Sequence, residues 1–135
     1  MKRRIVVVGG GHWGTNHIRT LIQLDSFIGV VETNKQTHNK LRENFNNINI
    51  YNSLSESFRD NPDGYTVATP PNTHFDIASQ ILYNSKPVLV EKPLTLDYNS
   101  SKKLVELANK RRINLMVGHV LLFHPAIQKI KKLIS

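Results

Sequence analysis

The feature that most constrains the fold is a run of β-branched residues that leads directly into a glycine cluster. Residues 5–8 read Ile-Val-Val-Val, and residues 9–14 read Gly-Gly-Gly-His-Trp-Gly, which contains the pattern G-x-G-x-x-G. A continuous β-branched run is typical of a strand buried on both faces, as in a parallel sheet. Ile18, Leu21 and Ile22 then recur at helical spacing. The segment therefore predicts a strand, a tight turn and a helix in immediate succession.

Strand and helix patterns alternate along the rest of the chain. Strands are expected at residues 5–8, 28–31, 48–51, 65–68, 88–90 and 114–117. Helices are expected at residues 15–24, 35–45, 73–82 and 125–133, with a helical turn at 53–58 and a further helix that begins after Asp97 as its N-cap. Parallel neighbours require crossover connections, which place helices on both faces of a sheet. This order predicts the fold class α/β with a doubly wound parallel sheet.

The composition fits one globular domain and excludes several classes of protein. The chain has 135 residues, 39% of them hydrophobic, and no Cys, so a disulfide scaffold, a thiolate metal site and a cysteine nucleophile are excluded. No H-E-x-x-H or other metal-ligand spacing occurs, and we assign no metal site. No apolar run approaches the ~20 residues of a membrane span, and no signal peptide follows Met1. We therefore expect a cytoplasmic protein with no membrane partner.

Charge is the one unusual feature of the composition. Lys and Arg number 18 against 10 Asp and Glu, a formal net charge of +8, which favours anionic partners. The cations fall in short separate runs without interleaved aromatic residues, unlike the surface of a nucleic-acid-binding protein. We expect no nucleic-acid partner, and a basic nucleic-acid binder stays as an alternative hypothesis.

The glycine cluster suits the recognition of a pyrophosphate. Gly9 can make the tight turn after the strand, Gly11 can let the backbone approach the pyrophosphate, and Gly14 can seat the helix against the strand. The free N–H groups and positive dipole at the start of the helix, where His12 and Trp13 stand, favour the same anion. We predict that these five residues bind the cofactor of a Rossmann-type dinucleotide-binding fold. The alternative is that the glycines only make a tight strand-to-helix turn and bind no ligand.

Glu32 ends the second expected strand, 18 residues after Gly14. An acidic side chain at this place can accept hydrogen bonds from the adenosine ribose hydroxyls, and its charge repels a 2′-phosphate. We therefore expect NAD in preference to NADP, although Thr33 and Lys35 leave some room for NADP. A plain surface carboxylate is the alternative.

Polar residues also follow the fourth strand. Pro70 and Pro71 remove two donors and stiffen a backbone that would pass beside a bound cofactor. We predict that Thr69, Pro70, Asn72 and His74 contribute to the cofactor site. For His74, a surface position at the start of the helix is an equal alternative.

Glu91 and Lys92 end the fifth strand. Lys92 can relay a proton or donate a hydrogen bond to a substrate oxygen. We assign Glu91 to the cofactor-binding residues, and its carboxylate can orient Lys92. A surface ion pair is the alternative. Gly118 and His119 end the sixth strand. All of these candidates lie at the carboxyl ends of strands, where ligands bind in doubly wound sheets.

Three segments together resemble the N-terminal half of the Gfo/Idh/MocA oxidoreductases. They are the glycine turn, the Thr-Pro-Pro-Asn-Thr-His sequence at residues 69–74 and the Glu-Lys-Pro sequence at residues 91–93. Residues 11–17 and 118–125 are similar to the branch of the family that oxidises UDP-linked N-acetyl amino sugars or their uronates at C3. The chain departs from the family pattern at Leu122, where many members carry an arginine.

The resemblance implies an NAD(P)-dependent sugar dehydrogenase that moves hydride between a nicotinamide and a carbon of a sugar or sugar nucleotide. It implies Lys92 as the catalytic residue and a cis peptide bond before Pro93. It also implies a dinucleotide-binding domain at residues 1–120, with residues 121–135 beginning the connection to a C-terminal substrate domain, and a homo-oligomer when full length. The 135-residue chain alone is then expected to be inactive. An NAD-sensing module without turnover stays as the second hypothesis.

Overall fold

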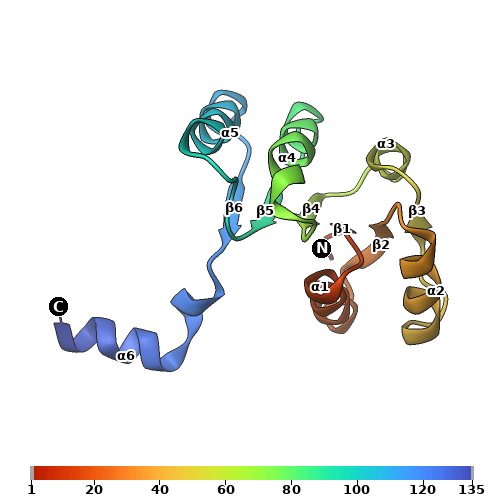
Figure 1. The fold of residues 1–135 in the computed structure, drawn as a ribbon, viewed down its shortest axis with the longest axis horizontal. Coiled ribbons are helices and arrows are strands. Elements are labelled where there is room, and N and C mark those ends of the chain that lie inside the picture. The colour runs from red at the N-terminus through yellow and green to blue at the C-terminus, as the bar shows by residue number, and fades with distance from the viewer. Residues whose placement is uncertain (1, 135) are drawn as a thin grey trace.

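Six parallel strands form the sheet in a computed structural model that describes residues 2–134 (Figure 1). The strands are β1 (Ile5–Val8), β2 (Phe27–Val31), β3 (Ile50–Tyr51), β4 (Gly64–Val67), β5 (Val88–Glu91) and β6 (Leu115–Gly118). Their order across the sheet is β3-β2-β1-β4-β5-β6, and each neighbouring pair is parallel. This arrangement confirms the predicted doubly wound sheet.

Helices cover both faces of the sheet. They are α1 (His12–Gln23), α2 (Lys35–Asn44), α3 (Leu54–Ser57), α4 (His74–Tyr83), α5 (Tyr98–Arg111) and α6 (Pro125–Ile134), with 3-10 helices η1 (Phe58–Asp60), η2 (Pro71–Thr73) and η3 (Val120–Phe123). Figure 1 shows α1 and α2 on one side of the sheet and α4 and α5 on the other. Asp97 is the N-cap of α5, as predicted, and its Oδ1 accepts a hydrogen bond from the Ser100 N–H at 2.8 Å. Hydrogen bonds from Ser100 hold the pKa of the Asp97 carboxyl below its usual value.

Most predicted elements differ from the observed bounds by one residue at one or both ends, and two elements differ by more. α1 begins at His12 and not at residue 15, because Gly11 is its extended N-cap and the first turn carries exposed side chains that give no apolar periodicity. β3 is limited to two residues, because its pairing with β2 covers only Val30 and Val31.

The core consists of two apolar clusters, one on each face of the sheet. Val7 packs with Ile18 and Leu41 on the side of α1 and α2. Val6 belongs to the larger cluster that includes Leu82 and other residues of α4 and α5. Successive strand residues point to opposite faces, so the β-branched run of β1 is buried on both faces, as predicted.

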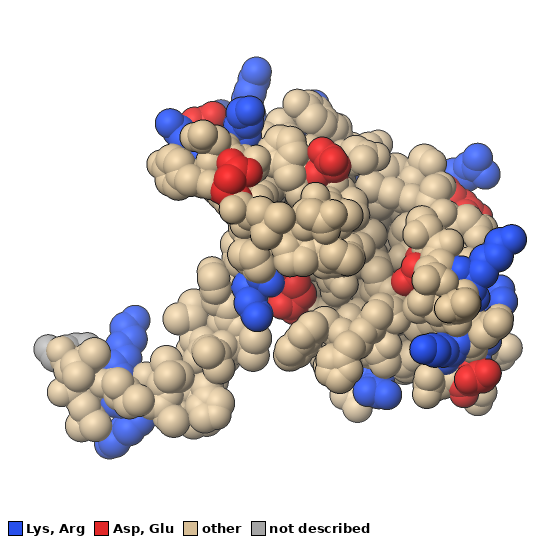
Figure 2. All heavy atoms as spheres, viewed as in Figure 1, with Lys and Arg blue, Asp and Glu red and all other residues tan. Residues whose placement is uncertain are grey.

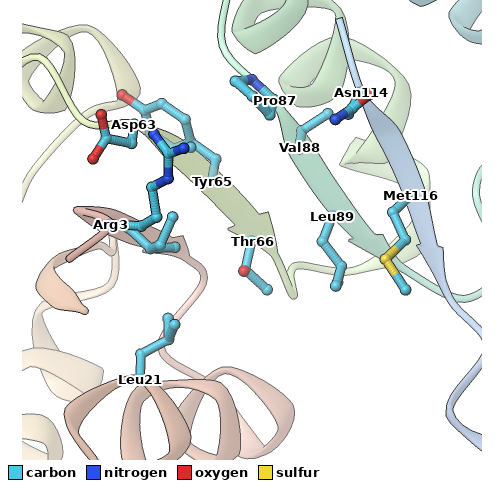
Figure 3. Close-up of a pocket in the computed structure, with 12 residues that line it drawn as sticks. Arg3, Leu21, Asp63, Tyr65, Thr66, Pro87, Val88, Leu89, Asn114 and Met116 are labelled. Atoms are coloured by element: carbon cyan, nitrogen blue, oxygen red, sulfur yellow. The ribbon is translucent and has the colours of Figure 1, made fainter. Parts of the chain in front are cut away.

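On the α1 side of the sheet, the strand residues become less covered by other elements from β1 towards β6. Val7, Thr66, Leu89 and Met116 form one row across β1, β4, β5 and β6. Thr66 is buried, whereas Met116 is 47% exposed. A hollow of about 470 Å³ lies there, with Leu21 of α1 facing the strand residues (Figure 3). It occupies the face of the sheet, apart from the carboxyl edge where the predicted site residues gather.

The C-terminal segment extends away from the sheet. Figures 1 and 2 show α6 as an arm beyond β6, and none of the described residues of η3 and α6 is buried. Across residues 2–134, no helix combines the length and apolar character needed to cross a bilayer.

Candidate functional site

The glycines of the turn after β1 have different physical roles. Gly9 has a φ of +94°, and a Cβ there would lie 2.9 Å from both the Ala68 carbonyl oxygen and Thr69 Cγ2. A Cβ on Gly14 would overlap the carbonyl oxygen of Gly9. Gly11, in contrast, has extended backbone, and no atom lies within 4 Å of its Cβ position. The protein's own packing therefore requires Gly9 and Gly14, whereas Gly11 leaves open space that another molecule can enter.

This turn opens onto a hollow of about 630 Å³ at the carboxyl edge of the sheet, which we call the glycine-turn hollow. The predicted residues that line it are Gly9, Gly11, Glu32, Thr69 and Pro70. Asn34, Thr37 and Asp76 also line it, and the sequence analysis assigned them no part. No side chain caps the first turn of α1, so its N–H groups remain available to an anion.

Glu32 is held firmly at the wall of this hollow. Its Oε2 accepts a hydrogen bond from the Gly10 N–H at 2.9 Å, and its Oε1 accepts one from the Asn34 N–H at 2.8 Å. The buried ring of His38 donates from Nε2 to the backbone carbonyl of Glu32 at 2.6 Å. Each carboxylate oxygen keeps a further lone pair, so Glu32 can still accept hydrogen bonds from ribose hydroxyls. The sequence analysis missed His38, whose only signal is its helical spacing to Leu41.

Besides Gly14, His74 and Glu91, three exposed residues predicted to bind the cofactor lie outside this hollow. His12 and Trp13 are exposed on α1, and their rings pack edge to face with centroids 5.9 Å apart. Asn72 is exposed on η2 and borders a separate hollow beside Asp97. The structure therefore does not bring these side chains together with Glu32.

His74 is buried, with 1% of its surface exposed, so the surface position considered for it is wrong. Its Nδ1 lies 2.9 Å from the Pro93 carbonyl oxygen, and its Nε2 lies 2.8 Å from the Thr69 carbonyl oxygen. Carbonyl oxygens only accept hydrogen bonds, so a bond at either place is donated by the ring. With both nitrogens turned to backbone, the ring supports the walls of the site and is not placed to contact a cofactor directly.

Glu91 pairs with a histidine that the sequence analysis left without a role. Glu91 Oε1 lies 2.7 Å from Nε2 of His17 on α1, and both side chains are largely buried. A Cβ on Gly118 would lie 3.1 Å from Glu91 Oε2, so the glycine makes room for the carboxylate. His17 follows Gly14 by three residues, which places the two on one helix face. That spacing is the signal that could have found it.

Lys92 lines a second hollow at the same edge of the sheet, which we call the lysine hollow. It measures about 420 Å³ and is bordered by Gly118, His119, Ile127 and the apolar residues 120–122. The peptide bond between Lys92 and Pro93 is cis, as the resemblance implied. The lysine hollow therefore combines an amine, an imidazole and an apolar wall.

The residues present fit a bound dinucleotide. The open Cβ position at Gly11 and the uncapped start of α1 suit a pyrophosphate, and the anchored carboxylate of Glu32 suits a ribose. Within residues 2–134, no group of three or more His, Asp or Glu is arranged to hold a metal ion. The fold and the site together define a Rossmann domain of the dinucleotide-binding class.

Comparison with known proteins identifies the family. The family pattern described as an oxidoreductase family with an NAD-binding Rossmann fold, Gfo/Idh/MocA, matches residues 3–119. The chain belongs to the Gfo/Idh/MocA oxidoreductases and is their NAD-binding domain. The match confirms the predicted family, fold class and cofactor.

Several relatives are similar over nearly the whole chain. UDP-N-acetylglucosamine 3-dehydrogenase from Acidithiobacillus ferrooxidans is 28% identical over 129 residues, which are 96% of this chain and 41% of that protein. The structure of GenD2 from gentamicin A biosynthesis in complex with NAD superimposes with a TM-score of 0.90 at 29% identity, over 100% of this chain and 40% of that one. The WlbA dehydrogenase from Bordetella pertussis, in complex with NADH and UDP-GlcNAcA, gives a TM-score of 0.89 at 25% identity, over 98% and 39%. The chain thus spans about 40% of the length of these relatives.

Proposed function

We propose that this chain is the cofactor-binding half of an oxidoreductase that transfers hydride between NAD and a hydroxyl-bearing carbon of a sugar or sugar nucleotide. The observation that carries the proposal is the open Cβ position of Gly11 at a hollow walled by Glu32, with Lys92 at the same edge of the sheet. The names of the relatives, a UDP-N-acetylglucosamine 3-dehydrogenase among them, support the substrate class. In this proposal the dinucleotide-binding domain comprises residues 1–120, and residues 121–135 begin the connection to a substrate domain.

The glycine-turn hollow takes the dinucleotide. The backbone at Gly11 and the N–H groups of the first turn of α1 bind the pyrophosphate, because their partial positive charge meets its negative charge. Glu32 accepts hydrogen bonds from the adenosine ribose and disfavours a 2′-phosphate, which selects NAD over NADP. Thr69 and Pro70 also line this hollow.

The lysine hollow takes the reacting part of the substrate. When bound, the nicotinamide supplies the centre that accepts hydride from the substrate carbon or returns it. Lys92 donates a hydrogen bond to the substrate hydroxyl oxygen or relays its proton. The apolar residues 120–122 line one side of this hollow.

A cytoplasmic location, a homo-oligomer and the absence of a nucleic-acid partner are part of the same proposal. On the face seen in Figure 2, Lys and Arg side chains stand in separate groups over several elements and form no continuous basic stripe. A small anionic ligand suits this distribution better than a polynucleotide, which requires a continuous positive track.

Calorimetric titration of the chain tests the cofactor assignment. We expect saturable binding of one NAD per chain, weaker binding of NADP, and no comparable affinity for duplex DNA at physiological salt. Failure to bind NAD, or tighter binding of DNA, would contradict the proposal. Assays of the complete protein with NAD and sugar nucleotides then separate an oxidoreductase from an NAD-sensing module, because the sensing module binds NAD without turnover.

A further inference from the structure

We propose that His17 and His74 are positioning residues for Lys92, which they hold through the residues on either side of it. Glu91 precedes Lys92 and is held by His17, whereas Pro93 follows Lys92 and is held by His74. The inference rests on the proposed role of Lys92 and adds to it the groups that set the place of the lysine.

The backbone around Lys92 sets the position of its side chain. Lys92 Nζ makes no hydrogen bond and no ion pair with any residue from 2 to 134. An amine on four flexible methylene groups without a partner samples many rotamers. The origin of that side chain, and therefore the volume that Nζ reaches, depends on how firmly its two neighbours are fixed.

The contact before Lys92 joins β5 to α1. His17 Nε2 and Glu91 Oε1 are 2.7 Å apart, and the exposed fractions of these side chains are 24% and 13%. Partial burial reduces competition by water and strengthens the hydrogen bond. Gly118 on β6 leaves room for the carboxylate, so Glu91 is confined between α1 and β6.

The contact after Lys92 joins the turn beyond β5 to α4. The ring of His74 bridges the carbonyl oxygens of Pro93 and Thr69 at 2.9 and 2.8 Å. The ring is 1% exposed, so the imidazole itself is shielded from solvent. Thr69 in turn lines the glycine-turn hollow.

The two histidines come from opposite layers of the fold. Figure 1 shows α1 and α4 on different faces of the sheet. α1 starts at the glycine turn, and Thr69 lines the glycine-turn hollow beside Gly9. The same two contacts therefore tie the backbone on either side of Lys92 to two elements that lead to the cofactor site, α1 and the segment at Thr69, which fixes the point from which the lysine side chain starts.

The test compares turnover and cofactor affinity in the complete oxidoreductase. His17→Leu removes the donor to Glu91, whereas His17→Gln keeps an N–H that can reach it. We expect His17→Leu to lower kcat by about tenfold or more, with NAD affinity within about twofold of the wild type, because misplaced catalytic groups slow the reaction without changing binding. His17→Gln should restore most of kcat, a rescue that a general loss of stability does not predict.

His74→Gln is the second variant, because one amide nitrogen can reach only one of the two carbonyls. We expect it to lower kcat in the same way. Tyr65→Phe is the control: it removes a buried hydroxyl that lies 3.1 Å from Ser57 Oγ and borders neither the glycine-turn hollow nor the lysine hollow, so kcat should stay unchanged. If His74→Gln does not fold, the two His17 variants decide the question.

Lys92→Ala separates failure of this inference from failure of the proposed function. If Lys92→Ala keeps full turnover, the role of the lysine is wrong and the positioning proposal falls with it. If Lys92→Ala loses turnover while His17→Leu keeps the wild-type kcat, the function stands and the positioning proposal is overturned.

Discussion

The α-carbon of Gly14 lies so close to the carbonyl oxygen of Gly9 that a side chain at Gly14 would overlap that oxygen. The start of α1 is therefore pressed against the end of β1 by direct backbone contact. Gly11, between them in sequence, has open space where its Cβ would be. Two glycines of one motif are thus required by the packing of the protein itself, whereas the third leaves open space.

This difference predicts opposite effects for two substitutions. Gly14→Ala should lower the free energy of unfolding by about 3 kcal/mol, because the methyl group forces α1 away from β1. Gly11→Val should cost only about 1 kcal/mol of stability, since a Cβ there meets no other atom and the change affects only the N-cap of α1, yet it should abolish NAD binding by filling the place of the pyrophosphate. Urea unfolding and calorimetry measure the two quantities. Equal NAD affinity in Gly11→Val and the wild type would show that the pyrophosphate does not lie there.

Glu32 should decide between NAD and NADP. Glu32→Gln keeps one acceptor oxygen and the shape of the side chain but removes the charge that repels a 2′-phosphate. The preference for NAD should narrow by about 1–3 kcal/mol, measured as the ratio of the two dissociation constants. Glu106→Gln, on the exposed face of α5, is the control and should change nothing. Tighter binding of NADP than NAD to the unmutated chain would show the role of Glu32 to be wrong.

Lys92→Ala should separate catalysis from cofactor binding. In the complete oxidoreductase we expect turnover to fall by about 10²- to 10⁴-fold, the usual contribution of a positioned acid or base. NAD affinity should stay nearly constant, because Lys92 lines the lysine hollow and not the glycine-turn hollow. Lys102→Ala on α5 is the matched control. A parallel loss of NAD affinity would instead place Lys92 at the cofactor.

The 135-residue chain by itself should bind NAD and catalyse nothing. The lysine hollow is bordered by apolar residues of η3 that are 54% to 66% exposed, so this side of the hollow is open to solvent. Positioning of the substrate accounts for many kcal/mol of an enzymatic barrier. Reduction of NAD with a UDP-amino sugar, followed by absorbance, should stay far below the ~10 per second of a median enzyme. A rate near that value would mean that catalysis requires no second domain to position the substrate.

Two buried tyrosines should make stability fall at alkaline pH. Burial raises the pKa of Tyr65 to about 12, and burial together with the hydrogen bond to Asp60 raises the pKa of Tyr51. The unfolded chain releases these protons near pH ~10, so the folded state keeps its full stability below about pH 10 and loses it as pH rises towards about 12. Urea unfolding between pH ~8 and ~11.5 should show a shallower decline for Tyr65→Phe, because one of the two phenols no longer titrates. Identical declines in the variant and the wild type would contradict the role of Tyr65.

Much of the fold follows from local patterns in the sequence. The β-branched run of β1, the glycine turn and the alternating apolar spacings predict the strands, the helices and the parallel sheet, because each pattern concerns residues a few positions apart. The same locality explains the N-cap at Asp97, whose partner Ser100 is three residues away. The start of α1 was harder to predict from the sequence. The buried residue of its first turn is Gly14, which has no side chain and therefore adds nothing to the apolar pattern.

The assignment of side chains within the site depended on tertiary structure. Sequence alone placed Glu32, Asn72 and His74 together at the strand ends, but only Glu32 lines the glycine-turn hollow, while Asn72 faces another hollow and His74 is buried. All three stand near the carboxyl edge, and the rotation of η2 and α4 decides which way each side chain points.

The sequence by itself determined the order of the elements, the parallel sheet and the edge at which the site lies, because periodicity and turn chemistry are properties of neighbouring residues. Only the tertiary structure decided that His17 meets Glu91 across 74 positions of sequence, and that His74 joins Thr69 to Pro93. These contacts depend on the register of the strands and on the rotation of each helix about its axis. Both are set by packing between distant segments, which no local pattern records.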